Sequence, residues 1–217
     1  LDGTRRFAAR SESPRRSVRL VYDVEDRPGR FLLPEEHMPE VPFHVHASDV
    51  LISLLRAWAA RAGRDVFVAR NLGCRWHRAD ARVGVDPDVC LLDPAPPDLF
   101  QIGALRTWLP GHRPPTLSVE VVSPTTVEVD YRDKPTRYGL LGTNELWIFD
   151  PTLMGPDDSG GPFVLQIWLR QGAQLVRVYA GNGPVQSPGL GAWLIPDCTA
   201  RELRLADDAE NTQPWPT

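Results

Sequence analysis

One segment of the chain, residues 48–62, carries apolar side chains at helical spacing. The apolar positions in it are Val50, Leu51, Leu54, Leu55 and Trp58. Gly63 follows where a helix is expected to stop. We predict a helix over 48–62 that Ser48 or Asp49 caps and that packs its apolar stripe on a sheet. Its amino-terminal end, with His46 just before it, would offer free N–H groups to a phosphate.

Short apolar or alternating runs predict strands elsewhere. The predicted strands are 17–25, 65–69, 74–79, 87–92, 116–122, 145–150, 163–170 and 174–180. The last two are joined by a short Gly-containing turn and form a predicted hairpin. An apolar segment over 190–204 adds a short terminal strand.

A second helix is predicted over 130–141, ending at Gly142. Pro135 complicates its start, because proline inside a helix removes a hydrogen bond and clashes with the preceding turn. Either the helix begins near Asp133–Lys134 with Pro135 in its first turn, or an irregular turn over 130–133 precedes it.

Proline-rich stretches separate these elements. Residues 34–43 are expected to form a loop, and so are residues 93–115, which hold six prolines. At most one helical turn is expected within 98–108. A loop of this length in a compact domain is usually functional or mobile.

The length of 217 residues and a hydrophobic content of 42% fit one domain. We expect it over 20–205, after a flexible Arg-rich arm at 1–19 and before a frayed tail at 206–217. No run approaches the roughly 18 apolar residues that a membrane span needs, and no signal peptide is expected. The three cysteines form no zinc or disulfide pattern, so we expect reduced thiols in a cytoplasmic protein.

The net charge of −4 does not by itself indicate nucleic-acid binding. The charge is unevenly distributed, however. Residues 1–82 hold 15 arginines against 11 acidic residues, and residues 83–217 hold 9 basic against 17 acidic residues. A basic first third could hold phosphates beside a metal site. A solvated basic surface explains the same distribution nearly as well.

Lys134 is the single lysine among the 24 basic residues of the chain; the other 23 are arginines. Lysine carries a compact charge, and burial can lower its pKa. Arginine is always charged and presents its donors in a planar fork. A position where arginine fails to replace lysine therefore favours a functional group that holds or activates a water beside a metal. Chance survival of one lysine is the alternative.

Two carboxylates lie on or beside predicted strands. Asp88 follows Pro87, and Glu120 lies in the centre of the apolar strand 116–122, on the opposite face from Val119. A buried carboxylate there costs several kcal/mol unless a cation or hydrogen bonds compensate. The compensating group is either a metal ion or an arginine.

These residues belong to a longer pattern. It comprises Pro87-Asp88, the run Val119-Glu-Val-Val-Ser-Pro-Thr-Thr126, then Asp130, Lys134, Tyr138 and Gly142, and the run Glu145-Leu-Trp-Ile-Phe-Asp-Pro151. The pattern resembles the Uma-type restriction endonuclease family of the PD-(D/E)XK nuclease superfamily. The resemblance covers roughly residues 43–205.

The resemblance implies an α+β fold, sandwich-like, in which helices flank a mixed β-sheet and further β-hairpins are added. It also implies that Asp88 and Glu120 bind Mg²⁺ (or Mn²⁺), helped by the backbone carbonyl of Val121. The superfamily's usual lysine position, two residues after the glutamate, is Val122 here. By this resemblance Lys134, on the following helix, fills that role.

Three further residues are placed near this site. Asp130, four residues before Lys134, would orient the lysine or a metal-bound water, or merely cap the helix. His46 and Tyr138 are expected near the site, although Tyr138 is as readily explained as a packing residue.

We therefore expect a Mg²⁺-dependent endonuclease that cuts DNA and acts as a homodimer, because nucleases of this fold often do. The second hypothesis is a catalytically inactive nuclease-fold module that binds nucleic acid or protein. The third is an unrelated β-rich small-molecule or scaffold domain in which Glu120 pairs with an arginine and lies far from Asp88.

Overall fold

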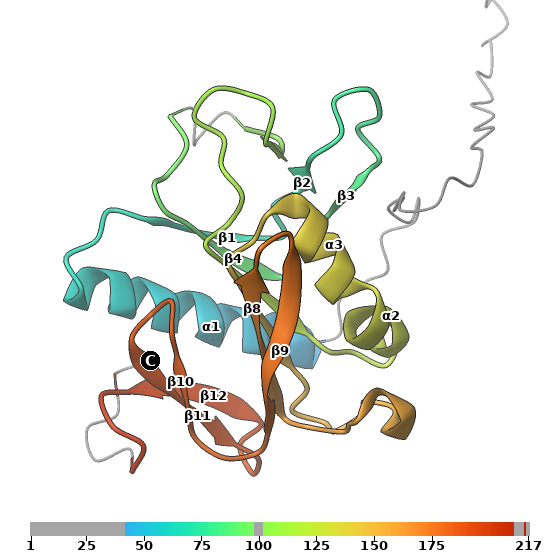
Figure 1. The fold of residues 1–217 in the computed structure, drawn as a ribbon. Coiled ribbons are helices and arrows are strands. Elements are labelled where there is room, and N and C mark those ends of the chain that lie inside the picture. Colours follow the sequence, from blue (N-terminus) through green and yellow to red (C-terminus); the bar gives the residue numbers. More distant parts are fainter. Residues whose placement is uncertain (1–41, 98–101, 211–214, 216–217) are drawn as a thin grey trace, which may run out of the picture. The chain divides into compact units, whose positions relative to one another are not determined.

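A computed structural model of the chain describes residues 42–97, 102–210 and 215 (Figure 1). The described residues all belong to one compact unit. The expected arm at 1–19 and the expected edge strand at 17–25 lie outside them. None of the described helices is long and apolar enough to cross a membrane.

A six-stranded mixed sheet forms the centre of the fold, in the order β1-β4-β6-β7-β8-β9. Its strands are β1 (Phe67–Arg70), β4 (Val89–Leu92), β6 (Leu117–Val121), β7 (Glu145–Phe149), β8 (Leu165–Gln171) and β9 (Gln174–Gly181). Only β6 and β7 pair in parallel; the other neighbours are antiparallel. The expected α+β class with a mixed sheet flanked by helices is confirmed.

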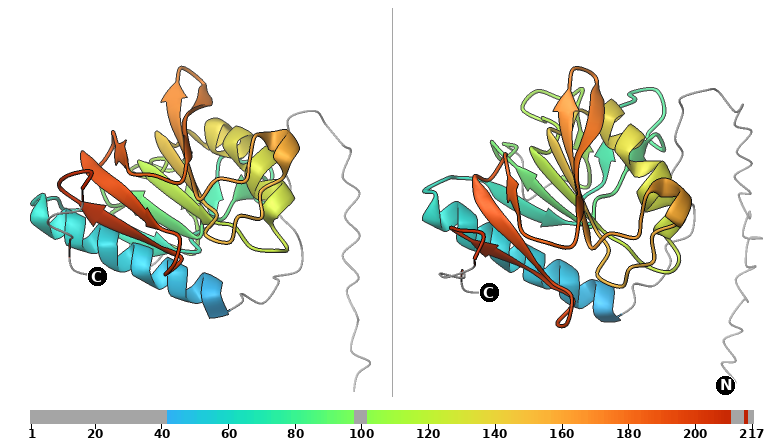
Figure 2. Two further views of the ribbon diagram at one scale, coloured as in Figure 1. Left: turned by 90° about the horizontal axis from the view of Figure 1, so that it is seen from below. Right: turned by 60° about the horizontal axis from the view of Figure 1, so that its bottom comes forward.

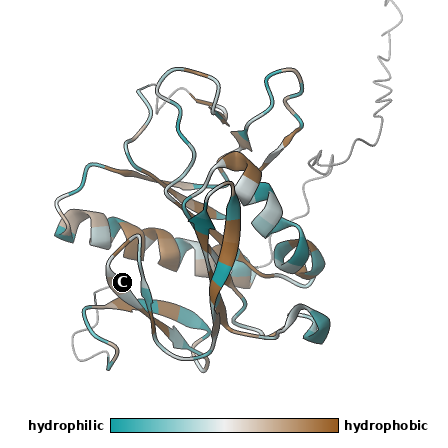
Figure 3. Cartoon of the chain, in the orientation of Figure 1, coloured by the Kyte–Doolittle hydropathy of each residue, from teal (hydrophilic) through white to brown (hydrophobic). Residues whose placement is uncertain are grey.

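Helices cover the two faces of this sheet. The core that contains helix α1 (Pro42–Arg61) includes Leu117, Val119 and Val121 of β6. Val122 belongs to the second core, with Tyr138 and the helices α2 (Val127–Arg132) and α3 (Lys134–Leu141). Figure 2 shows α1 and the α2–α3 pair on opposite sides of the sheet, and Figure 3 shows apolar residues along the central strands. The alternation of strand 116–122 therefore predicted its two faces correctly.

Helix α1 begins earlier than expected. It starts at Pro42, inside the segment predicted to be a loop, and Ser48 is fully buried in its interior. Proline is well suited to the first helical position, where its missing N–H would have no partner in the helix. The predicted cap at Ser48 or Asp49, and the phosphate site at that point, are therefore wrong. The predicted end is confirmed, because Gly63 adopts a left-handed φ of 62° just after the helix.

The segment around Pro135 forms two helices instead of one. Helix α2 ends at Arg132, and α3 begins at Lys134 with Pro135 in its first turn. This agrees with the first of the two alternatives, although the α2 turn upstream begins already at Val127. Gly142 ends α3 with a φ of 106°, a conformation that favours glycine.

Two small sheets complete the fold. One joins β3 (Gly84–Val85), β2 (Cys74–Arg75) and β5 (Leu105–Arg106), and the other joins β10 (Val185–Ser187), β11 (Ala192–Asp197) and β12 (Glu202–Ala206). A short 3₁₀ turn, Asp157–Ser159, precedes β8. The strand predicted over 74–79 is reduced to two residues, and the described part of 98–108 forms β5 instead of a helical turn.

Trp215 lies in the segment 206–217 that was expected to fray, and it is held by packing and hydrogen bonds. Trp215 packs in the main core, and its backbone N–H donates to the carbonyl of Leu205 at 3.0 Å. Its indole N–H donates to Asp207 at 3.2 Å. The expectation of a frayed tail is therefore wrong at this residue.

Candidate active site

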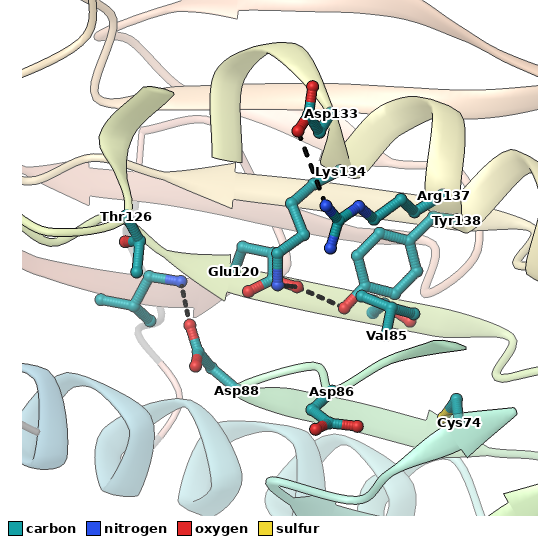
Figure 4. A network of polar contacts seen from close by, with 12 residues as sticks. Cys74, Val85, Asp86, Asp88, Glu120, Thr126, Asp133, Lys134, Arg137 and Tyr138 are labelled. Carbon is teal, nitrogen blue, oxygen red and sulfur yellow. Dashed lines mark hydrogen bonds and ion pairs between the residues drawn. The ribbon is translucent and has the colours of Figure 1, made fainter. Parts of the chain in front are cut away.

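The strand register brings Asp88 and Glu120 together. Val89 of β4 pairs with Val119 of β6 in an antiparallel ladder. The next step of that ladder sets Asp88 opposite Glu120, and opposite residues of antiparallel strands face the same side. Two carboxylates 32 positions apart in the sequence thus meet at one end of the central strands (Figure 4).

Glu120 is held by two donors from α3. Its side chain is 3% exposed, and its Oε1 accepts from Lys134 Nζ at 2.7 Å. The hydroxyl of Tyr138 donates to the same oxygen. Both hydrogen bonds to the Glu120 carboxylate go to Oε1, which leaves Oε2 without a hydrogen bond among the described residues.

The turn after β6 explains how the lysine reaches the glutamate from so far along the chain. The N–H of Ser123 donates to Thr126 Oγ1 at 3.2 Å, and the N–H of Thr126 returns a bond to the carbonyl of Ser123 at 3.1 Å. Such local bonds of Ser and Thr favour a tight turn. The turn folds α2 and α3 back, so that Lys134 lies over Glu120.

Asp88 is held by one backbone donor and lies within ion-pair distance of one imidazole. The N–H of Val121 donates to Oδ2 at 2.7 Å, and His44 Nε2 lies 3.1 Å from the same oxygen. His44 is 8% exposed and comes from the first turn of α1. Asp88 Oδ1 makes no hydrogen bond among the residues the structure describes.

His44, and not His46, is therefore the histidine of this cluster. His46 points elsewhere, with Nε2 3.5 Å from Oε1 of Glu202 and a side chain that is 61% exposed. Two positions along a helix turn a side chain by about 200°, so the pair cannot share a face. The expectation for His46 assumed that the helix began after it, and that start was wrong.

Asp130 is the third carboxylate of the cluster. It is 1% exposed, and its Oδ2 has no hydrogen-bond partner among the described residues. Burial raises its pKa to about 6, against the opposing effect of Lys134 and of a hydrogen bond from Thr126; the charge of Asp88 raises it further. The structure thus brings Asp130 into the electrostatic field of both Asp88 and Lys134.

Burial and charge also shift the pKa values of the central pair. Burial raises the pKa of Glu120 well above its ordinary value, although Lys134 opposes the shift. Burial alone would lower the pKa of Lys134, but Glu120, Asp130 and Asp88 outweigh it and the pKa is raised. Lys134 is therefore a permanently charged donor, and not the lysine of lowered pKa that burial alone suggested.

The donor set has the chemistry of a Mg²⁺ site. Oxygen ligands suit Mg²⁺, which commonly binds one or two carboxylates together with water and phosphate oxygens. Neither Asp88 Oδ1 nor Glu120 Oε2 accepts a hydrogen bond from a described residue. The N–H of Val121 points to Asp88, and in a strand the carbonyl of the same residue points to the same side. Within the described residues, however, no group of three or more His, Cys, Asp or Glu side chains is arranged to hold a metal ion.

The third hypothesis required a structure different from this one. It placed Glu120 in a pair with an arginine and far from Asp88. Glu120 pairs instead with Lys134, and the charge of Asp88 contributes to its raised pKa.

Comparison with known proteins gives one family. The family described as "Uma2: Putative restriction endonuclease" matches residues 33–153. A solved structure from Anabaena variabilis ATCC 29413, described as a putative nuclease belonging to DUF820, matches with a TM-score of 0.48 and 15% identity. That match covers 71% of this chain and 76% of the other. None of the curated proteins matches the chain.

Proposed function

The chain belongs to the Uma2 family, and from this we propose that it is a Mg²⁺-dependent endonuclease that hydrolyses phosphodiester bonds in DNA. One observation carries the proposal. Asp88, Glu120 and Lys134 come from three separate elements, and the fold brings them to one end of the central strands with Nζ of Lys134 2.7 Å from Glu120.

Asp88, Glu120 and the carbonyl of Val121 would hold the metal ion. A bound Mg²⁺ polarises the phosphate and lowers the pKa of a coordinated water. The protein's own part is to keep two carboxylate oxygens, Asp88 Oδ1 and Glu120 Oε2, available on the same side of the sheet. Burial of Glu120 excludes bulk water from that side and strengthens every charge interaction there.

Lys134 would act on the developing negative charge. Its raised pKa keeps it protonated. Its ammonium group would donate hydrogen bonds to the phosphate and stabilise the negative charge that develops as the nucleophile bonds to phosphorus. Asp130 contributes to that raised pKa and would hold the lysine charged and in place. We therefore propose the orienting role for Asp130 in preference to that of a helix cap.

The DNA backbone would be held by arginines whose side chains have no partner among the described residues. Among the described residues, five exposed arginines form no ion pair or hydrogen bond through their side chains: Arg56, Arg78, Arg106, Arg113 and Arg201. Arg78 lies in the connection between β2 and β3, and Arg106 lies in β5. Both belong to the region of the small sheet β3-β2-β5, whose strand β3 contacts α3. Unpaired guanidinium groups in this part of the fold suit phosphate contacts.

We propose a homodimer in the cytoplasm as the working state. The described cysteines Cys74, Cys90 and Cys198 are all free, which fits a reducing compartment.

The direct test is cleavage of a fluorescent duplex and its single strand by wild type and Glu120→Gln, with Mg²⁺, Mn²⁺ or EDTA. Gln keeps the size of the side chain and removes the charge that a metal needs. We expect metal-dependent cutting by the wild type that falls at least 100-fold in the variant, the scale at which electrostatic catalysis acts. Undiminished cutting by a folded Glu120→Gln protein would exclude this site.

A second candidate is a nuclease-fold module that binds nucleic acid or protein without catalysis. The lack of a preformed three-ligand group among the described residues favours it. The two functions differ in their response to Mg²⁺. A nuclease should melt at a higher temperature in millimolar Mg²⁺, because ligand binding stabilises the folded state; the binding module should show no shift.

A further inference from the structure

The two carboxylates that face each other are held in the same way. Asp88 accepts the N–H of Val121 at Oδ2, and the same oxygen lies 3.1 Å from His44 Nε2; Glu120 accepts two donors at one oxygen, Oε1. In each case the second oxygen makes no hydrogen bond among the described residues. One donor in each pair belongs to the expected site, Val121 for Asp88 and Lys134 for Glu120. The second partner, His44 for Asp88 and Tyr138 for Glu120, has no role assigned so far.

We propose that His44 and Tyr138 are a matched pair of positioning residues that fix the two carboxylates of the proposed nuclease site with Asp88 Oδ1 and Glu120 Oε2 presented to a shared divalent cation. The proposal rests on the proposed function and names the residues that orient its ligands. His44 acts from α1 and Tyr138 from α3, so the two helices that cover opposite faces of the sheet both contribute to the site.

Rotation of the carboxylates is the motion that these residues prevent. A carboxylate with one donor can swing about its terminal torsion, which is broad and roughly two-fold. Two polar partners at one oxygen fix both that oxygen and, by the planarity of the group, the direction of the other. Partners of this kind orient metal ligands and change metal affinity by about 10- to 100-fold when they are removed.

The burial of both residues fits this role. Tyr138 is fully buried and His44 is 8% exposed, so each is fixed by packing in one core while its polar atom reaches the strand end. Tyr138 also packs among apolar neighbours in its cluster, including Leu146 and Ile148. Phenylalanine could supply that packing, and only the hydroxyl is needed to explain the contact with Glu120.

The test compares Mn²⁺ affinity in His44→Leu, His44→Gln, Tyr138→Phe and wild type, measured from the melting temperature at increasing Mn²⁺. His44→Gln keeps a neutral N–H donor at a similar reach. We expect the Mn²⁺ concentration at half-saturation to rise about tenfold in His44→Leu and in Tyr138→Phe, and to stay within about twofold of wild type in His44→Gln.

Two control variants separate positioning from general loss of structure. His46→Leu removes a histidine two residues away on the same helix that contacts Glu202 and not Asp88. Tyr131→Phe removes a buried tyrosine hydroxyl that donates to a different carboxylate, Asp150, at 2.7 Å. Neither should change the Mn²⁺ concentration at half-saturation, even if Tyr131→Phe lowers the melting temperature in the absence of metal.

The outcomes distinguish the two claims. If the wild type binds Mn²⁺ and His44→Leu and Tyr138→Phe bind it equally well, the positioning role is overturned and the proposed nuclease stands. If the controls weaken Mn²⁺ binding as much as the variants at His44 and Tyr138, the positioning role is likewise overturned. A folded wild type that binds no Mn²⁺ overturns the proposed function, and the positioning role with it.

Discussion

Nζ of Lys134 lies 2.7 Å from Oε1 of Glu120, and their side chains are 13% and 3% exposed. The only lysine of the chain is thus paired with the one carboxylate in the middle of an apolar strand. The pair joins α3 to β6 across the second core. It also places the Lys134 ammonium group, whose raised pKa keeps it protonated, beside the oxygens proposed to bind the metal.

Removal of Lys134 should lower the stability of the protein as well as abolish its activity. Lys134→Met leaves Glu120 buried without its cation, and breaking a buried pair on one side typically costs about 3–5 kcal/mol. We expect a loss of free energy of unfolding on the order of 3 kcal/mol at pH 8, measured by urea denaturation. The double variant Glu120→Gln/Lys134→Met should recover most of it, because no buried charge remains. A double variant that unfolds as easily as Lys134→Met would contradict this interpretation.

Asp130 should make the metal-free protein less stable as the pH rises. Its pKa is raised from 3.8 to about 6 on folding, so the folded state holds the proton more tightly than the unfolded chain. The resulting stability is fully present below pH 4 and is lost as the pH rises through about 6. A shift of this size corresponds to about 3 kcal/mol.

Asp130→Asn should remove this dependence, because asparagine does not titrate. Measured by urea denaturation in EDTA, the variant should gain stability relative to wild type between pH 5 and pH 7.5, and the difference should level off above that range. A difference that stays constant over the whole range would show that Asp130 does not titrate near 6.

The free arginines should determine the salt dependence of DNA binding. Arg78→Ala and Arg106→Ala should each weaken binding to any sequence and reduce the slope of log affinity against log salt by about 1. Arg201→Ala is the matched control, since Arg201 is equally free but lies between β11 and β12, in the other small sheet. The assignment fails if all three variants have the same slope as wild type in fluorescence anisotropy.

The central part of the fold was predictable because its signals are local. The alternation around Glu120 predicted which side chains face each core, and Gly142 predicted the end of α3. The hairpin of β8 and β9 follows from two apolar strands and a turn at Gly172. The meeting of Asp88 with Glu120 is not local, and the resemblance to a known family supplied it.

Other parts failed for identifiable physical reasons. Pro42 was taken as a loop residue although proline suits a helix start, and this error hid His44, whose partner Asp88 lies 44 residues away. The sheet of β10–β12 was reduced to one strand because Pro188, Gly189 and Gly191 interrupt its apolar pattern. Trp215 was assigned to a frayed tail because a single aromatic residue among polar neighbours does not reveal the core that it enters.

The measurement that tests the central claim most directly is cleavage of supercoiled plasmid by wild type and Lys134→Ala, side by side in Mg²⁺, Mn²⁺ and EDTA. Lys134→Arg should be included, because a forked guanidinium cannot replace a compact ammonium at this position. We predict that the wild type cuts the plasmid only with metal and that both variants, although folded, do not. Cutting by folded Lys134→Ala at the rate of the wild type would contradict the claim that this lysine serves a nuclease site.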